Sequence, residues 1–206
     1  MAARRAGAKI PCAMLAILPA FALGLADPCA GGAPRGTIDP SVSTVEVEVS
    51  RSGLLSAFGH DHRIVAPVAS GHVLCREGPR AEIAFDARSL RVADSGLPDS
   101  DREKVEATME GPEVLDAARY PEVVFRSTAI EAAGDGRWSV AGSLTLHGAT
   151  HAVRAEVSLS NGRYRGATVF KLTDFGIRPP VVAGGTVRVR DEVRIVFDVA
   201  VRGPSE

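Results

Sequence analysis

Several short stretches of this chain alternate apolar and charged residues with a period of two. The clearest are residues 45–49, 153–157 and 193–199. Successive side chains of a β-strand point to opposite faces, so this alternation gives each strand one apolar and one polar face. Such strands build antiparallel sheets that enclose an apolar interior on one side and meet water on the other.

The alternation, bounded by turn-forming residues, predicts strands along most of the chain. The expected strands are residues 43–50, 64–68, 71–76, 81–86, 123–130, 138–146, 152–159, 165–172 and 187–201. The sequence therefore predicts an all-β protein.

Residues 99–118 break this pattern. They contain good helix formers without a period of two, and Asp99 or Ser100 is placed to cap the start of a helix. Gly111 and Pro112 are expected to end that helix. One helical insertion in an all-β chain favours a barrel with a helix at one end, although strand spacing alone does not separate a barrel from a sandwich.

The first residues have the composition of a secretory signal. Basic residues precede an apolar run over 10–26, and Gly24 and Ala26 are small residues of the kind that a signal peptidase recognises. A membrane anchor is the alternative, but the run is short for a span of about 20 residues and contains Pro11 and Pro19. We therefore expect residues 1–26 to be removed and the protein to be periplasmic or secreted.

The next residues, 27–41, are rich in glycine and proline and are expected to form a flexible leader, followed by one domain over 42–203. Cys12 would leave with the signal. Cys29 and Cys75 could then pair in an oxidising compartment, and the sequence leaves this disulfide open. A lipid anchor at Cys29 is disfavoured, because the residues before it are not the small apolar residues expected there.

Charge excludes one class of partner. Removal of the signal takes away three basic residues and no acidic one, so the formal net charge moves from −1 to about −4. A slightly acidic domain is a poor match for a polyanion, so nucleic acid is not expected as a partner.

Several motifs, read in order along the chain, resemble the YceI-like family of secreted bacterial proteins. They are Phe58-Gly59-His60, Asp101-Arg102, the segment 120–128 (YPEVVFRST), the segment 140–148 (VAGSLTLHG) and Asp174-Phe175-Gly176-Ile177. The resemblance implies an eight-stranded, antiparallel, lipocalin-like β-barrel with a helix beside it. For characterised relatives it also implies a polyisoprenoid or isoprenoid quinone bound inside.

An eight-stranded barrel has an interior that side chains just fill or that holds one small ligand. The side chains expected to point inward carry no charge: Val45, Val47, Val73, Ile83, Phe85, Val123, Phe125, Trp138, Val140, Leu144, Val157, Phe170, Val193, Ile195 and Phe197. The residues expected to line a lipid site are Val47, Phe58, Phe85, Phe125, Trp138, Val140, Leu144, Phe170 and Phe197. Any folded barrel has apolar residues inside, so a filled barrel without a ligand stays open as an alternative.

Two histidines stand out because many relatives have one at this place. His60 and His62 are two residues apart and would face the same way on a strand. They could contribute to a zinc or copper site if His72, His147 or His151 completed it, but two ligands do not close a tetrahedral site. We expect them at the barrel rim, bonded to the adjacent turn or to a polar head group, with no metal.

Two further motifs are expected to be structural. Tyr120 is placed to cover one end of the barrel where Pro121 precedes a strand, and Gly176 indicates a tight turn at the barrel mouth.

Nothing in the sequence argues for catalysis, because it contains neither a Gly-x-Ser-x-Gly elbow nor a glycine-rich phosphate loop. The predicted function is a secreted or periplasmic protein that sequesters or carries an apolar isoprenoid-type lipid and requires no cofactor. Transient contact with a membrane is compatible with this function. The alternatives are a His-dependent metal- or haem-interacting envelope protein and a ligand-free structural barrel.

Overall fold

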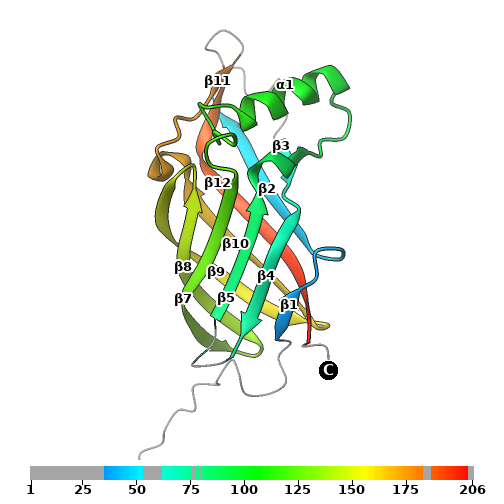
Figure 1. Cartoon of the computed structure of the whole chain (residues 1–206), viewed down its shortest axis with the longest axis vertical. Coiled ribbons are helices and arrows are strands. Elements are labelled where there is room, and N and C mark those ends of the chain that lie inside the picture. The colour runs from blue at the N-terminus through cyan, green and yellow to red at the C-terminus, as the bar shows by residue number, and fades with distance from the viewer. Residues whose placement is uncertain (1–34, 53–61, 76–77, 79, 183–186, 204–206) are drawn as a thin grey trace, which may run out of the picture.

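A computed structural model describes residues 35–52, 62–75, 78, 80–182 and 187–203. Antiparallel strands dominate it, and they wrap into a barrel whose long axis runs vertically in Figure 1. The strands are β1 (Gly36–Ile38), β2 (Thr44–Ser52), β3 (His62–Val65), β4 (Val68–Leu74), β5 (Arg80–Asp86), β6 (Arg91–Val92), β7 (Glu122–Gly134), β8 (Arg137–Leu146), β9 (Ala149–Ser160), β10 (Arg163–Lys171), β11 (Val181–Val182) and β12 (Val187–Arg202). The helices are α1 (Asp99–Glu110) and the short 3₁₀ helices η2 (Ala87–Ser89) and η3 (Leu172–Phe175).

Eight of these strands pair in a closed ring, in the order β1, β4, β5, β7, β8, β9, β10 and β12. The ring closes because β1 pairs on one side with β4 and on the other with β12, where Ile38 lies opposite Val201. All of these pairings are antiparallel. The prediction of an eight-stranded antiparallel barrel is confirmed.

The long strand β12 changes partner along its length. Its C-terminal end pairs with β1, whereas residues further back pair with β2, which continues to β3 and β6. In the described part of the chain, β6 pairs with β3 alone, so the upper end of the barrel has a sheet edge at β6.

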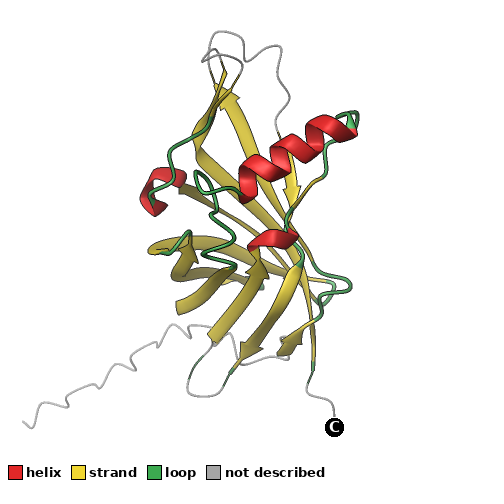
Figure 2. Ribbon diagram, turned by 45° about the horizontal axis from the view of Figure 1, so that its top comes forward, coloured by secondary structure: helices red, strands yellow, loops and turns green. Residues whose placement is uncertain are grey.

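Helix α1 lies at this upper end (Figure 2), and it is the one α-helix among the described residues. It ends at Glu110 with Gly111 as the C-cap, as the sequence predicts, so the expected helical stretch 99–118 is shorter in the structure. The expected cap is wrong: Pro98 occupies the N-cap without a side-chain bond, and Asp99 lies in the first turn. A carboxylate there is stabilised by the helix dipole instead. No helix of the described residues is long and apolar enough to span a membrane.

The prediction of a flexible leader over 27–41 is also wrong for its C-terminal part. Gly36–Ile38 form β1, which closes the barrel. Three residues are too few to show a period of two. Their strand conformation depends on pairing with β4 and β12, which are far away in the sequence.

Alternation of burial along the strands places the apolar side chains inside the barrel. In β8, Trp138, Val140, Gly142, Leu144 and Leu146 are buried, and the residues that alternate with them are partly exposed. Gly142 takes the remaining inward position because the ring of Phe125 on β7 fills its space. A Cβ atom at Gly142 would lie 2.4 Å from that ring.

Candidate ligand cavity

The barrel encloses two adjoining apolar chambers. We call them the upper chamber, beside α1, and the lower chamber, toward the opposite end of the barrel. The upper chamber has a volume of ≈ 470 Å³ and the lower chamber ≈ 180 Å³. An apolar cavity of about 150 Å³ is already large enough to bind a small hydrocarbon, so the barrel is not filled by its own side chains.

The lower chamber is bounded by side chains from all eight ring strands together with Val45 of β2. Those that define its shape are Val73, Ile83, Phe125, Ile130, Trp138, Val140, Val157, Tyr164 and Phe197. Trp138 and Tyr164 meet edge to face with their ring centroids 5.9 Å apart. Burial raises the pKa of the Tyr164 hydroxyl, which therefore stays protonated across the physiological range.

The upper chamber combines barrel side chains with one face of α1. The helix contributes Asp101, Lys104, Val105, Thr108 and Met109, whose spacing places them on a single face. Val105 and Met109 extend the apolar wall, while the other three bring polar atoms to the chamber. The polar atoms of the cavity wall are therefore concentrated toward the α1 end.

Four residues line both chambers: Val45, Phe85, Leu144 and Ile195. They come from β5, β8 and β12 of the ring and from β2, which pairs with β12. We call these four residues the waist. A ligand that occupies both chambers must pass between these four side chains.

All of the predicted inward residues line one chamber or both. Val47, Val123, Phe170 and Val193 line the upper chamber, Val73, Ile83, Phe125, Trp138, Val140, Val157 and Phe197 line the lower one, and Val45, Phe85, Leu144 and Ile195 line both. The predicted contacts Phe58 and His60 lie outside the described residues. The role of this lining in lipid binding stays a prediction.

His62 lines the upper chamber and is held by an acidic residue. Its Nδ1 lies 2.5 Å from Asp94 Oδ2, and the other carboxylate oxygen accepts a hydrogen bond from the Arg63 backbone N–H at 2.8 Å. Both side chains are mostly buried. Because a carboxylate accepts, Nδ1 donates, and this bond fixes the ring orientation at the chamber wall.

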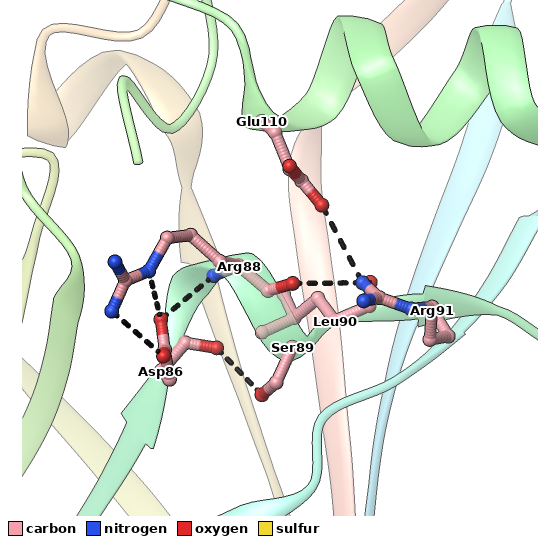
Figure 3. A network of polar contacts seen from close by, with 6 residues as sticks. All are labelled: Asp86, Arg88, Ser89, Leu90, Arg91 and Glu110. Atoms are coloured by element: carbon pink, nitrogen blue, oxygen red, sulfur yellow. Dashed lines mark hydrogen bonds and ion pairs between the residues drawn. The ribbon is translucent and has the colours of Figure 1, made fainter. Parts of the chain in front are cut away.

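Helix α1 is attached to the barrel by carboxylates as well as by apolar contacts. Glu106 Oε1 accepts a hydrogen bond from the Val92 backbone N–H at 2.8 Å, which satisfies a donor on the edge strand β6. Glu110 lies 3.4 Å from Arg91, whose guanidinium also donates to backbone oxygens of the η2 segment (Figure 3). The helix thus covers an edge that would otherwise expose unpaired backbone groups.

The contribution of α1 to the cavity was not predicted from the sequence. Val105 and Met109 are the only strongly apolar side chains of the helix, so its amphipathic pattern is weak. The separation of four residues between them was the available signal, since it places both on one helical face.

Three residues of the family motifs, Tyr120, His147 and Phe175, are not among the chamber-lining residues and contact one another. His147 Nδ1 lies 3.2 Å from the carbonyl oxygen of Phe175, and the His147 ring packs edge to face on Tyr120. Phe175 is buried against His151. This contact joins the turn after β8 to η3. Gly176 adopts φ +74°, which confirms the tight turn expected there.

These contacts separate the histidines that a metal site would require. His147 and His151 pack beside Phe175, whereas His72 lies on β4 opposite Glu82. Within the described residues, no group of three or more His, Cys, Asp or Glu side chains is placed to hold a metal ion.

A closed eight-stranded barrel that encloses apolar chambers is the architecture of lipocalin-like proteins. The YceI-like domain family matches residues 37–201, and the chain belongs to this family. The family is a binding-protein fold rather than a known enzyme family, and it is known for binding polyisoprenoids.

Relatives and solved structures agree with this assignment. A UPF0312 protein of Pseudomonas savastanoi is 38% identical over 76 residues, covering 32% of this chain and 40% of the relative. A UPF0312 protein of Pseudomonas putida is 34% identical over 100 residues, covering 43% and 47%. The aligned part is thus less than half the length of these relatives.

The structural comparisons concern the fold alone. The crystal structure of Burkholderia cenocepacia BcnA has a TM-score of 0.59 at 20% identity, and the match covers 79% of this chain and 98% of that one. A mutant of the Campylobacter jejuni YceI protein has a TM-score of 0.51 at 10% identity, covering 66% and 84%.

Proposed function

We propose that this protein sequesters or carries an apolar isoprenoid-type lipid, a polyisoprenoid or isoprenoid quinone, in the periplasm or outside the cell. The observation that carries the proposal is the pair of adjoining chambers inside the barrel, which share four lining residues and are walled by apolar side chains. Each methylene group that leaves water for such a cavity gains about 0.8 kcal/mol. A hydrocarbon chain is therefore held without a polar anchor along its length.

The distribution of polar groups supports one orientation of the lipid. His62, Asp101, Lys104 and Thr108 lie at the wall of the upper chamber, so a polar head group belongs at this end and the hydrocarbon chain below it. The two rival functions have less support. The volume of the upper chamber argues against a filled barrel, and the described residues offer no set of three metal ligands.

The test is lipid extraction and mass spectrometry of the full-length protein purified from its native host. The wild-type protein is expected to yield a near-stoichiometric prenyl lipid. Val140→Trp should reduce this yield several-fold, because Val140 is buried and lines the lower chamber. Overpacking of this kind costs about 1–3 kcal/mol, so circular dichroism must first show that the variant is folded.

The matched control is Ala141→Trp. Ala141 is the next residue of β8 and points to the opposite face of the sheet, so the same side chain added there leaves the cavity unchanged. Equal lipid yields from folded Val140→Trp and Ala141→Trp variants, or no lipid in the wild-type protein, would contradict the proposal.

A further inference from the structure

β11 and the start of β12 form a hairpin at the upper end of the barrel, to the left of α1 in Figure 1. Val181 lies opposite Arg188 in this hairpin, and the backbone N–H of Val189 donates to the carbonyl oxygen of Pro180 at 2.9 Å. We call the described residues 178–182 and 187–190 the arm. Pro180 and Val189 line the upper chamber, so the arm forms part of the chamber wall.

The arm is strongly cationic on its exposed side. Arg178, Arg188 and Arg190 are all exposed. Within the described part of the chain, neither Arg178 nor Arg190 forms an ion pair. Residues 175–190 contain three arginines and no acidic residue, although the whole chain has a formal net charge of −1. The positive charge of the arm is therefore a local feature.

An apolar side chain lies on the same face as this charge. Val181 is 50% exposed and lies directly opposite Arg188, so both side chains are on the face of the arm that points away from Val189 and the chamber. Basic side chains attract anionic lipid head groups, and an apolar side chain beside them gains free energy by entering the boundary with the acyl chains. The outer face of the arm combines both properties.

We propose that the arm docks the protein on an anionic membrane surface, with the upper chamber beside the bilayer. Charge complementarity selects an anionic partner. The position of the arm selects a bilayer, because the residues at its base line the chamber in which an apolar lipid is proposed to bind, and such a lipid resides in a membrane. To this extent the inference rests on the proposed function.

Helix α1 determines which part of the upper end faces the membrane. It contains five acidic and two basic residues, so its formal charge is −3, and it lies on the other side of the upper end (Figure 1). An anionic surface attracts the arm and repels this helix. The protein therefore docks with the arm foremost and α1 turned away.

The first test is flotation of the mature protein with lipid vesicles. The protein should float with mixed vesicles of phosphatidylglycerol and phosphatidylcholine and should remain behind with vesicles of phosphatidylcholine alone. Binding should weaken as the salt concentration rises, because salt screens the attraction between exposed charges. Each arginine near the surface should raise the partition coefficient by about fivefold.

The decisive variant is Arg178→Gln/Arg190→Gln, which should lower this partition coefficient by roughly 25-fold. Its matched control is Arg80→Gln/Arg137→Gln, which removes the same charge from two exposed positions where β5 and β8 begin. The residues that follow them, Ala81 and Trp138, line the lower chamber, so these arginines lie at the opposite end of the barrel. Equal losses in the two variants would assign vesicle binding to net charge and overturn the inference.

A second test measures which end of the barrel touches the acyl chains. In Val181→Trp, vesicles that carry brominated acyl chains should quench the fluorescence of the new tryptophan. Val42→Trp is the control, because Val42 is 51% exposed and bonds to Arg163 beside the lower chamber. The signal of Trp138, measured in the wild-type protein, is subtracted from both. Equal quenching of the two variants, or no quenching of Val181→Trp, would contradict docking through the arm.

The docking is measured without a bound lipid, so it can fail independently of the proposed function. If the wild-type protein does not float with the mixed vesicles at low salt, the inference is overturned, while lipid extraction still decides the proposed function. Self-association without vesicles that is abolished by Arg178→Gln/Arg190→Gln would assign the arm to a second copy of the chain and would also overturn it.

Discussion

Two β-hairpins share a turn conformation but differ in what surrounds it. His147 and Gly148 join β8 to β9, and Asn161 and Gly162 join β9 to β10, each pair with φ close to +50° and +74°. Two successive residues with positive φ form the turn whose twist matches that of paired strands. A Cβ atom at Gly148 would lie 2.5 Å from the ring of Tyr120, whereas one at Gly162 would meet no atom within 4 Å.

A comparison of Gly148 with Gly162 therefore separates the energetic cost of backbone strain from the cost of a steric clash with a neighbouring side chain. We expect Gly162→Ala to lower the free energy of unfolding by about 1–2 kcal/mol, the cost of a left-handed residue with a side chain. Gly148→Ala should cost about 1–3 kcal/mol more, because the methyl group displaces Tyr120. Urea denaturation of both variants measures the difference. Equal losses would show that the contact between Gly148 and Tyr120 has no energetic role.

Cys75 is disulfide-bonded in the structure, and the other two cysteines of the chain, Cys12 and Cys29, lie outside the described residues. If residues 1–26 are removed as expected, Cys29 is the remaining partner. Peptide mapping of the non-reduced secreted protein should then recover a Cys29–Cys75 peptide. Cys29→Ser should lower the free energy of unfolding by about 2–4 kcal/mol, as for other disulfides that close a long loop. A free Cys75 thiol in the wild-type protein would contradict this prediction.

At the scale of elements, the attachment of α1 determines how firmly the upper chamber is covered. Glu106 bonds to a backbone donor of β6 at 2.8 Å, whereas Glu110 and Arg91 form a longer and more exposed ion pair. A hydrogen bond to a charged acceptor contributes about 1.5–3 kcal/mol, and an exposed ion pair contributes less than about 1 kcal/mol. The two carboxylates on one helix are therefore expected to differ in importance.

We expect Glu106→Ala to speed amide hydrogen exchange at Val92 and throughout α1 by roughly tenfold or more, corresponding to the lost bond. Glu110→Ala is the matched control and should change these rates little. Hydrogen-exchange mass spectrometry measures both. Faster exchange in Glu110→Ala than in Glu106→Ala would assign the attachment to the ion pair instead.

At the scale of the whole molecule, aspartates that accept hydrogen bonds make the free energy of unfolding depend on pH. Burial alone would raise the pKa of Asp198, but hydrogen bonds from Arg165 and Arg163 outweigh it and hold this pKa below its usual value. A backbone hydrogen bond from Thr173 is the main cause of the lowered pKa of Asp191. Because their folded-state pKa values are lowered, these groups stabilise the protein above pH of about 4, and the contribution is lost as pH falls through the folded-state values.

The unfolding free energy should therefore be nearly constant at neutral pH and fall below a pH of about 4. Asp198→Asn should flatten part of this acid dependence and cost at most about 1 kcal/mol at pH 7, since the pair is partly exposed. Asp135→Asn, at an almost fully exposed position, is the control. Denaturation curves from pH 2 to pH 7 would contradict the prediction if both variants matched the wild-type slope.

The sequence by itself determined the all-β class, the inward faces of the strands and the end of α1 at Gly111. These properties depend on local chemistry: the period of two fixes which side chains share a face, and Gly111-Pro112 stops a helix. The family motifs added the number of strands and the closed ring.

Only the tertiary structure decided where the ring closes, how the cavity is divided and what covers it. Gly36–Ile38 are too short to be identified as a strand without β4 and β12 beside them. The waist joins residues from β2, β5, β8 and β12, and Glu106 meets Val92 across a loop. Such contacts depend on strand register and on distant partners, which no local pattern of apolar and polar residues specifies.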